Sequence, residues 1–225
     1  MRKIEVIQSV LEANETIAER NHQLLDRHRV YCLNLMSAPG AGKTSLILHT
    51  LRALKEALRI GVIEGDVAST VDAERVQHEA RAVLQINTRN MPDSCSLTAG
   101  MIGAALNEMP LDDLDLMIIE NIGNLICPSE FVLGEHKRVV ISSVAEGDDK
   151  TAKYPLIFVD ADAVVVNKID LLPYVEFDVA GFSKSVAELN SDAYIFPLSC
   201  KSGEGIERWC SWVSEQVGAG KDRKG

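Results

Sequence analysis

Residues 37–44 read SAPGAGKT and follow VYCLNLM, an apolar run at residues 30–36 that predicts a buried strand. A helical pattern begins directly after them, so we expect a loop between a strand and a helix. The stretch fits the pattern G-x-x-x-x-G-K-[ST], with Ser37 in place of the first glycine. In this pattern, backbone N–H groups of the loop and of the helix N-terminus point at phosphate oxygens. The sequence therefore predicts a phosphate-binding loop on an α/β fold.

Two side chains of this loop predict the chemistry of the phosphate site. Lys43 is expected to reach the β- and γ-phosphates as a positive charge, and the Thr44 hydroxyl to ligate Mg²⁺. Gly40 and Gly42 allow a close backbone approach that a Cβ would block. The alternative is a glycine-rich turn whose lysine is only solvated, which the strand–loop–helix context disfavours. The residues expected to contact a nucleotide here are Pro39, Gly40, Ala41, Gly42, Lys43, Thr44 and Ser45.

Apolar runs and helical patterns alternate along the rest of the chain, which predicts a mostly parallel sheet with helices on both faces. Ligands bind such sheets beyond the carboxyl ends of the strands, where each motif described below is found. The expected strands are residues 30–36, 59–64, 83–86, 116–120, 138–144, 163–167 and 194–198, and the expected helices are residues 3–28, 45–58, 72–80, 97–109, 183–190 and 205–217.

The composition narrows the class of function. The 225 residues carry 23 Lys and Arg against 33 Asp and Glu, a net charge of −10, which argues against generic nucleic-acid binding. No run of about 18 apolar residues predicts a membrane span, and the N-terminal MRKIEVIQSV carries charge in place of a secretion signal. Five scattered cysteines without a CxxC pair are typical of free thiols in a reducing cytosol. We therefore expect a cytoplasmic protein with a packed core and no disulfide framework.

A second motif, NKID at residues 167–170, ends a predicted strand. The Asp170 carboxylate can accept hydrogen bonds from N1–H and the 2-amino group of guanine, and adenine offers no such pair of donors. Asn167 is expected to bond the other edge of the base, and the Lys168 stem to cover its face. The next strand ends in LSCK at residues 198–201, where backbone N–H groups can meet the guanine oxygen. Together these motifs favour GTP and GDP over a polar loop of no function; the expected contacts are Asn167, Lys168, Asp170, Ser199, Cys200 and Lys201.

Two further strand ends lie between these motifs, EGD at residues 64–66 and ENIG at residues 120–123. A nucleotide-dependent switch needs a carboxylate near Mg²⁺ and a mobile amide near the γ-phosphate. Asp66 and Glu120 are the candidate carboxylates, as catalytic residues beside Lys43 and as Mg²⁺ ligands, Glu120 directly or through water. The Gly123 N–H is the candidate γ-phosphate sensor. The alternative is that Glu120 only caps a strand end.

The same region predicts slow chemistry. No glutamine follows the switch glycine in the place that usually positions the attacking water, and no arginine finger is identifiable. Asp72 and Arg75 are expected to be ordinary capping and surface charges. We therefore expect slow intrinsic hydrolysis.

The order of these motifs resembles that of a known family. SAPGAGKT, EGD, ENIGNLICP, EGDDKTAKYP and NKIDLLP follow one another as in the nickel-incorporation GTPases of hydrogenase maturation, the HypB family of SIMIBI-class P-loop GTPases. The resemblance covers residues 30–215 and is densest between residues 120 and 173. The helical pattern before this range predicts an arm at residues 1–29, followed by a P-loop GTPase domain at 30–218 and a flexible tail at 219–225. The arm is expected either to pack on the domain edge or to serve an interface.

The resemblance also implies a function, a metallochaperone switch that hydrolyses GTP and assists nickel insertion into [NiFe]-hydrogenase. It implies a homodimer that forms with GTP. The implied partners are a nickel-binding, zinc-containing accessory protein and the hydrogenase large-subunit precursor. The urease accessory GTPase is the nearest cousin, but its metal motif is Cys-Pro-His, where this chain has Cys127-Pro128-Ser129.

A transition-metal site is implied in the same way. The family uses a Cys-His pair before the E-x-x-G strand and a cysteine after it, which places ligands at Cys95 and Cys127, with Ser96 where the histidine is expected. A twofold dimer would bring four thiolates together at its interface, a set that suits Zn²⁺ and allows planar binding of Ni²⁺. Nothing in the sequence favours His78 or His136 as a further ligand. A GTPase without its own metal stays an alternative, and NKID followed by SCK disfavours a small-molecule kinase.

Overall fold

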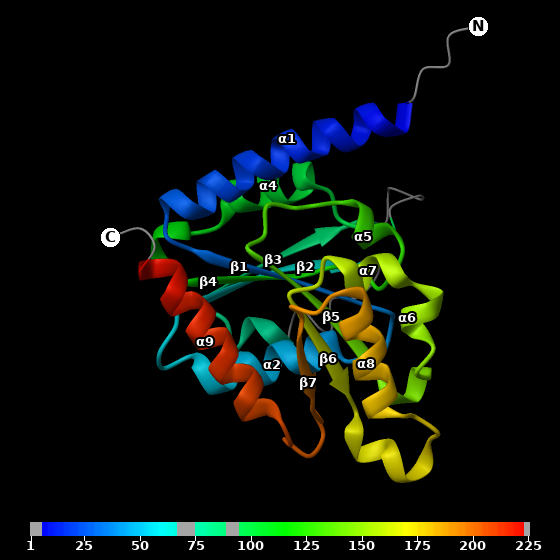
Figure 1. Ribbon diagram of the computed structural model, residues 1–225. Helices are drawn as coiled ribbons and strands as arrows, with labels where there is room; N and C mark the ends of the chain where they lie inside the picture. The colour runs from blue at the N-terminus through cyan, green and yellow to red at the C-terminus, as the bar shows by residue number, and fades with distance from the viewer. Residues whose placement is uncertain (1–5, 67–74, 89–94, 223–225) are drawn as a thin grey trace, which may run out of the picture.

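A seven-stranded parallel sheet forms the centre of the protein, described by a computed structural model for residues 6–66, 75–88 and 95–222 (Figure 1). Every neighbouring pair of strands is parallel, as the alternation of strand and helix patterns predicts. The strands are β1 (Tyr31–Ser37), β2 (Ile60–Asp66), β3 (Ala82–Asn87), β4 (Leu116–Glu120), β5 (Lys137–Ser143), β6 (Ala163–Asn167) and β7 (Tyr194–Pro197), in the order β3-β2-β4-β1-β5-β6-β7. The predicted α/β fold is confirmed.

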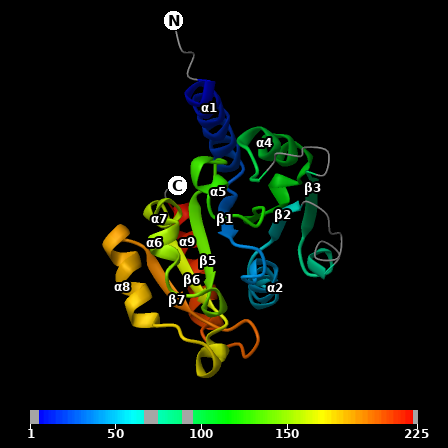
Figure 2. The same cartoon turned by 90° about the vertical axis from the view of Figure 1, so that its right-hand side faces the viewer.

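Helices cover both faces of the sheet (Figure 2). Because side chains alternate along a strand, each strand supplies apolar residues to two layers. On one face α2 (Lys43–Leu54) and α9 (Ile206–Asp222) bury the larger core cluster. On the other face α1 (Val6–Arg27) and α4 (Ala99–Glu108) cover β1, β2 and β4, whereas α7 (Pro155–Val159) and α8 (Val179–Leu189) cover β5 and β6.

Short helices occupy the connections that follow the strands. They are α5 (Cys127–Glu130), α6 (Lys150–Lys153) and the 3-10 turns η1 (Leu111–Asp113), η2 (Val144–Glu146) and η3 (Ile169–Tyr174). No helix among the residues described has an apolar stretch long enough to cross a bilayer.

Buried asparagines fasten α1 to the domain. Asn14 donates to the carbonyl of Val132 over 2.7 Å and accepts from the N–H of Ala99 over 2.8 Å. Asn21 donates to the carbonyls of Ala99 and Leu133 over 2.8 and 2.9 Å. These bonds satisfy backbone groups at the start of α4 and in the segment before β5. The arm, whose place the sequence leaves open, packs against α4 and over one face of the sheet.

The ends of two helices differ from the prediction. α2 begins at Lys43, two residues before the expected start, so that Lys43 lies in its first turn. α9 continues to Asp222, so the prediction of a flexible tail from residue 219 is wrong for residues 219–222. Gly220 permits this extension because a Cβ there would lie 2.7 Å from the Tyr31 ring. Of the helix predicted at 72–80, residues 75–77 are helical and residues 72–74 lie outside the described part.

Candidate functional site

A cavity of about 520 Å³ opens at the carboxyl edge of the sheet, beside the ends of β1, β2 and β4. This is the edge at which parallel α/β sheets bind their ligands. The cavity joins the loop at residues 37–44 to the ENIG segment, as the motifs predict. Its lining consists of Pro39, Gly40, Gly42, Lys43, Thr44, Ser45, Glu64, Gly65, Arg75, Glu120, Asn121, Ile122 and Gly123.

The backbone of the loop explains its glycines. Gly40 and Gly42 have φ angles of +76° and +105°, in the region that other residues rarely adopt. Ser37, which replaces the first glycine of the motif, is not among the described residues with positive φ and ends β1 as an ordinary strand residue. The departure at Ser37 therefore imposes no backbone strain on the loop.

Lys43 is folded back into the loop. Its Nζ donates to Ser37 Oγ over 3.0 Å, and the side chain is only 8% exposed. Burial lowers the pKa of Lys43, and the negative charges of Glu120 and Glu146 oppose this shift. A buried ammonium group attracts phosphate oxygens strongly because its charge is little screened by water, and the nearby carboxylates favour its charged form.

A set of oxygen ligands lies beside the lysine. The Thr44 hydroxyl donates to Glu120 Oε1 over 2.8 Å. Glu64 lies next to Glu120 in the parallel register of β2 and β4, and the two are 3% and 9% exposed. Hydroxyl and carboxylate oxygens are the ligands that Mg²⁺ prefers, so these residues fit this ion. The side chain of Asp66 lies outside the described part of the chain, and its predicted role stays a prediction.

Glu64 and Arg75 are lining residues that the sequence analysis did not single out as functional. Glu64 stands two positions before the candidate carboxylate Asp66 in the sequence EGD at residues 64–66, and residues two apart in a strand alternate with the one between them. That spacing was the available signal for Glu64. Arg75, expected to be a surface charge, is exposed and also lines the cavity.

Residues 121–127, which we call the switch segment, contact the phosphate loop directly through Gly123. A Cβ on Gly123 would lie 3.0–3.2 Å from three atoms of Pro39, so a larger residue fits only if Pro39 shifts by a few tenths of an ångström. Asn121 is buried and donates to Asn34 Oδ1 over 3.2 Å, and its own Oδ1 accepts from Ile122 N–H over 2.9 Å. The segment is thus held against the loop without a ligand. A sensor role for the Gly123 N–H stays a prediction.

Asn167 ties the phosphate loop to the base-reading loop. Its Nδ2 donates to the Ala41 carbonyl over 2.8 Å, and its Oδ1 accepts from the N–H groups of Lys168 and Cys200 over 2.7 and 3.2 Å. The side chain is 2% exposed. One of the two N–H donors of its amide is used in this way, and the expectation that Asn167 also bonds an edge of the base stays a prediction. In this structure Asn167 holds the two loops at a fixed distance from each other.

Two other residues of NKID, Lys168 and Asp170, are held by bonds to neighbouring loops, and their contacts with a base stay a prediction. Lys168 has a left-handed backbone, with φ +63°, and its Nζ donates to the Gly40 carbonyl over 2.7 Å. The side chain thus crosses toward the phosphate loop. Ser199 Oγ donates to Asp170 Oδ1 over 2.5 Å and accepts from the N–H of Lys201 over 3.1 Å. This bond fixes the direction of the Asp170 carboxylate.

The LSCK loop is also tied to α2. His49 Nε2 donates to the Cys200 carbonyl over 2.7 Å. The Cys200 N–H, expected to meet the guanine oxygen, donates to Asn167 in this structure. Burial raises the pKa of the Cys200 thiol to about 11, so the thiol stays protonated at neutral pH.

The two cysteines expected to bind metal form a disulfide. Cys95 and Cys127 are joined at 2.06 Å between sulfurs and 5.9 Å between Cα atoms, which corrects the expectation of free thiols. Cys32, Cys200 and Cys210 are free. The bond forms because the fold lays the segment before α4 beside the start of α5, a contact that a spacing of 32 residues does not reveal. Metal-binding cysteines are thiolates, so the pair in this form does not fit Ni²⁺ or Zn²⁺.

Elsewhere among the described residues, one cluster of side chains could in principle hold a metal ion. It consists of His22, Asp26 and His136. The Cys32 N–H donates to His136 Nδ1 over 3.0 Å, which places the ring proton on Nε2. That proton is donated to Asp26 Oδ1 over 2.9 Å. His136 therefore has no lone pair for a cation, and the group links α1 to the start of β5.

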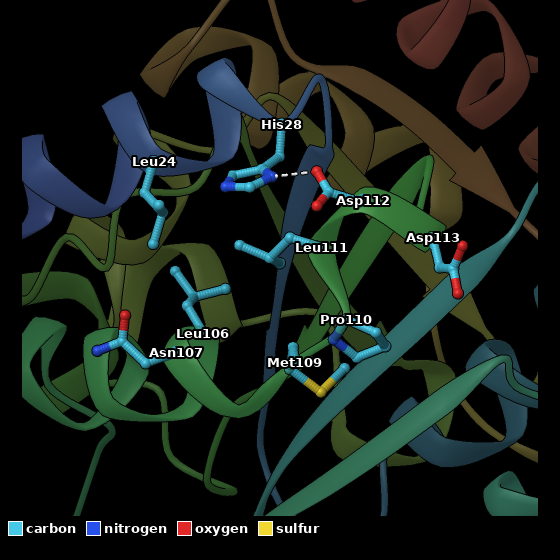
Figure 3. A pocket seen from close by; sticks show the side chains of 9 residues that line it. All are labelled: Leu24, His28, Leu106, Asn107, Met109, Pro110, Leu111, Asp112 and Asp113. Carbon is cyan, nitrogen blue, oxygen red and sulfur yellow. Dashed lines mark hydrogen bonds and ion pairs between the residues drawn. The ribbon is translucent and has the colours of Figure 1, made fainter.

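A second cavity, of about 460 Å³, lies at the opposite, amino edge of the sheet (Figure 3). Leu24 of α1, and His28 just after this helix, face Leu106 of α4 and Leu111 of η1 across it, and His28 bonds Asp112 over 2.7 Å. None of the motif residues lines it. We therefore assign the nucleotide chemistry to the cavity at the carboxyl edge.

Comparisons with known proteins agree with this geometry. The model of the family "CobW/HypB/UreG, nucleotide-binding domain" matches residues 32–197. The hydrogenase maturation factor HypB of Escherichia coli (strain K12) is 42% identical over 215 residues, which cover 96% of this chain and 73% of that protein. This chain belongs to the HypB family.

Solved structures of HypB proteins share its fold. The crystal structure of the hydrogenase maturation factor HypB from Archaeoglobus fulgidus is similar with a TM-score of 0.85 at 38% identity, covering 92% of this chain and 99% of that one. HypB from Helicobacter pylori, crystallised in complex with nickel, is similar with a TM-score of 0.84 at 35% identity, covering 91% and 95%. These matches confirm the resemblance found in the motifs, and they extend over nearly all of this chain.

Proposed function

We propose that this chain is a GTP-hydrolysing switch that assists nickel insertion during [NiFe]-hydrogenase maturation. One observation carries the proposal. The phosphate loop and the NKID loop meet at one edge of the sheet, joined by the bond from Asn167 to the Ala41 carbonyl, in a chain that matches HypB proteins over most of its length. This arrangement binds a guanine base and a polyphosphate as one ligand.

The phosphate end of the site supports hydrolysis. Loop N–H groups and Lys43 hold the β- and γ-phosphates, and the lysine neutralises charge that develops on the oxygens between them. Thr44, Glu120 and Glu64 would hold Mg²⁺, which adds a second positive charge at the same oxygens. No described residue that lines the cavity is a glutamine, so the attacking water lacks its usual partner. We expect slow hydrolysis by the isolated protein.

The base end supports selection of GTP. Ser199 already holds one oxygen of Asp170, so the carboxylate presents a fixed direction to a pair of N–H donors. A base without that pair of donors leaves a partly buried charge unsatisfied, which is a strong penalty.

Nickel is the cargo of this proposal rather than a resident cofactor. The pair Cys95 and Cys127 offers thiolates only when its disulfide is reduced, so we assign cargo binding to the reduced protein. Two copies of the pair at a GTP-dependent dimer interface would supply four sulfurs for Ni²⁺ or Zn²⁺. The partners are a nickel-binding, zinc-containing accessory protein and the hydrogenase large-subunit precursor, which the protein meets in the cytoplasm.

The test uses the full chain in its reduced form. Single-turnover phosphate release from GTP and from ATP measures the reaction and its base preference, with Lys43→Ala as the control. Solution mass with GDP and with a GTP analogue, and metal content in the same samples, measure the dimer and its cargo. Slow release from GTP alone and dimerisation with the analogue support the proposal. Equal use of ATP, or no nickel in reduced protein, overturns it.

A further inference from the structure

The disulfide joins two segments beside the nucleotide cavity. Cys127 opens α5, four residues after Gly123, and Cys95 lies before α4. Both cysteines are partly buried and remain reachable from solvent. Cys127 Sγ also lies 3.7 Å from Asn124 Nδ2, inside the switch segment itself.

A hydrogen bond links the same segments at a second place. Asn121 Oδ1 accepts from the Leu97 N–H over 3.2 Å, on the side of the switch segment that adjoins β4. Residues 95–97 are therefore connected to residues 121–127 at both ends of the switch segment, once by a hydrogen bond and once by a covalent bond. Such a double connection restricts the movements that are open to Gly123 between them.

The contact of Gly123 with Pro39 links this restriction to the phosphate loop. The switch segment lies directly on the phosphate loop, so closely that an added Cβ on Gly123 would be only 3.0–3.2 Å from Pro39. Any rearrangement of the Gly123 N–H around a γ-phosphate has to move residues 121–127. With the disulfide intact, such a movement has to carry Cys95 along.

Thiol chemistry is confined to this pair. Burial raises the pKa of Cys32 well above its usual value and raises the pKa of Cys200 and of Cys210 to about 11. These three thiols are protonated at neutral pH and react slowly, since the thiolate is the nucleophile. Cys95 and Cys127 are therefore the cysteines that exchange with thiols in solution.

We infer that Cys95 and Cys127 form a reversible dithiol–disulfide site that exchanges with low-molecular-weight thiols and controls the movement of the switch segment. In reduction, one thiolate RS⁻ attacks a sulfur of the bond, forms a mixed disulfide and releases the other cysteine as a thiolate. A second RS⁻ attacks the mixed disulfide and releases RSSR. The two cysteines gain two electrons and two protons, and two RSH become one RSSR. Oxidation by RSSR is the reverse.

The first part of the test follows the bond in the full chain without nucleotide. The protein is equilibrated with buffers of reduced and oxidised glutathione, quenched in acid and alkylated, and its peptides are measured by mass spectrometry. We expect Cys95 and Cys127 to pass together between thiol and disulfide, and Cys32, Cys200 and Cys210 to remain thiols. A bond that forms at no glutathione ratio, or that no ratio reduces, overturns the inference.

The second part measures the switch segment without relying on nucleotide. Amide hydrogen exchange in residues 119–130 is expected to be about tenfold slower in the oxidised than in the reduced protein. Cys127→Ala and the double variant Cys95→Ser/Cys127→Ser should exchange at the reduced rate in both buffers. Cys210→Ala, outside the pair, should keep the difference. Equal exchange in both forms of the wild type overturns the control of the switch.

One consequence of this inference rests on the proposed function, namely that the disulfide changes the affinity for GTP. We expect the reduced protein to bind a GTP analogue about fivefold more tightly than the oxidised protein, with a smaller change for GDP. If neither form binds the analogue while exchange still differs, the proposed function fails and the redox site stands. If both forms bind it equally, the consequence for GTP is overturned.

Discussion

The Thr44 hydroxyl donates to Glu120 Oε1 over 2.8 Å, and this bond connects the first turn of α2 to the end of β4. The hydroxyl oxygen keeps two lone pairs, which stay available to a cation in the cavity. A cation that binds Thr44 therefore meets Glu120 in the same place. The cavity holds this arrangement ready before any ligand arrives.

Glu120→Gln tests this arrangement. The amide removes a negative charge beside the Mg²⁺ site, so we expect the rate of GTP hydrolysis at fixed Mg²⁺ to fall on the order of 100-fold. Nucleotide affinity in the absence of Mg²⁺ should change little or rise. Glu130→Gln, on the exposed surface of α5, is the control and should keep the wild-type rate. An unchanged rate in Glu120→Gln would remove Glu120 from the metal site.

Asp170→Asn tests the reading of the base. An amide can donate to the extra oxygen of xanthine, so preference should move from GTP to XTP by at least about 100-fold. Competition of unlabelled GTP and XTP against a fluorescent nucleotide measures this ratio. Ser199→Ala, which only releases the carboxylate, should weaken GTP binding without creating a preference for XTP. Asp170 does not read the base if Asp170→Asn keeps its affinity for GTP.

Asn167→Ala tests the link between the two loops. It leaves the Ala41 carbonyl and the N–H groups of Lys168 and Cys200 without their partner, so the free energy of unfolding should fall by about 3 kcal/mol. Urea unfolding of the nucleotide-free protein measures this change. Asn107→Ala, at the exposed rim of the second cavity, should change it by less than about 0.5 kcal/mol. Equal stability of the two variants would show that the link is not structural.

Lys43→Met tests the buried charge. Burial lowers the pKa of Lys43 below 10.5, its value in an unfolded chain, so between the two values the unfolded chain binds one proton more. Stability therefore gains with rising pH across this window, and the methionine variant lacks that gain. Urea unfolding of both nucleotide-free proteins from about pH 8 to pH 10.5 measures the difference, in which all other titrating groups cancel. Parallel curves would contradict a lowered pKa.

Asn21→Ala tests the attachment of α1. The change leaves the buried carbonyls of Ala99 and Leu133 without their donor, and the free energy of unfolding should fall by about 2–3 kcal/mol. Val10→Ala, on the exposed face of the same helix, should have almost no effect. If Asn21→Ala unfolds at the wild-type urea concentration, α1 is held by its apolar contacts alone.

The sequence predicted the sheet well because its strands are buried on both faces. β4 and β6 were predicted to the residue, since each is an apolar run that ends in a polar motif. The short helices α5 and α7 were not predicted, because four or five residues show no helical period. Pro128 and Pro155 in their first turns were a signal that could have been used.

The candidate site was predicted in its residue types more than in its contacts. Lys43, Thr44 and Glu120 lie together as expected, because each motif follows a strand that ends at the same edge. The bonds of Asn167 to the phosphate loop and to the Cys200 N–H were not predicted, because a motif states which residue is present and not which atoms it bonds. The disulfide was missed because Cys95 and Cys127 meet only through the tertiary fold.

The bond from His49 to the Cys200 carbonyl connects α2 to the LSCK loop, in addition to its connection with the phosphate loop. The helix begins at the phosphate loop with Lys43, and its second turn holds the loop that faces the base. The helix α2 thus sets the distance between the phosphate loop and the LSCK loop. The site therefore selects a ligand by the distance between its base and its phosphates as well as by the two groups themselves. A guanine compound with a longer or shorter connection to its phosphates could contact only one of the two loops.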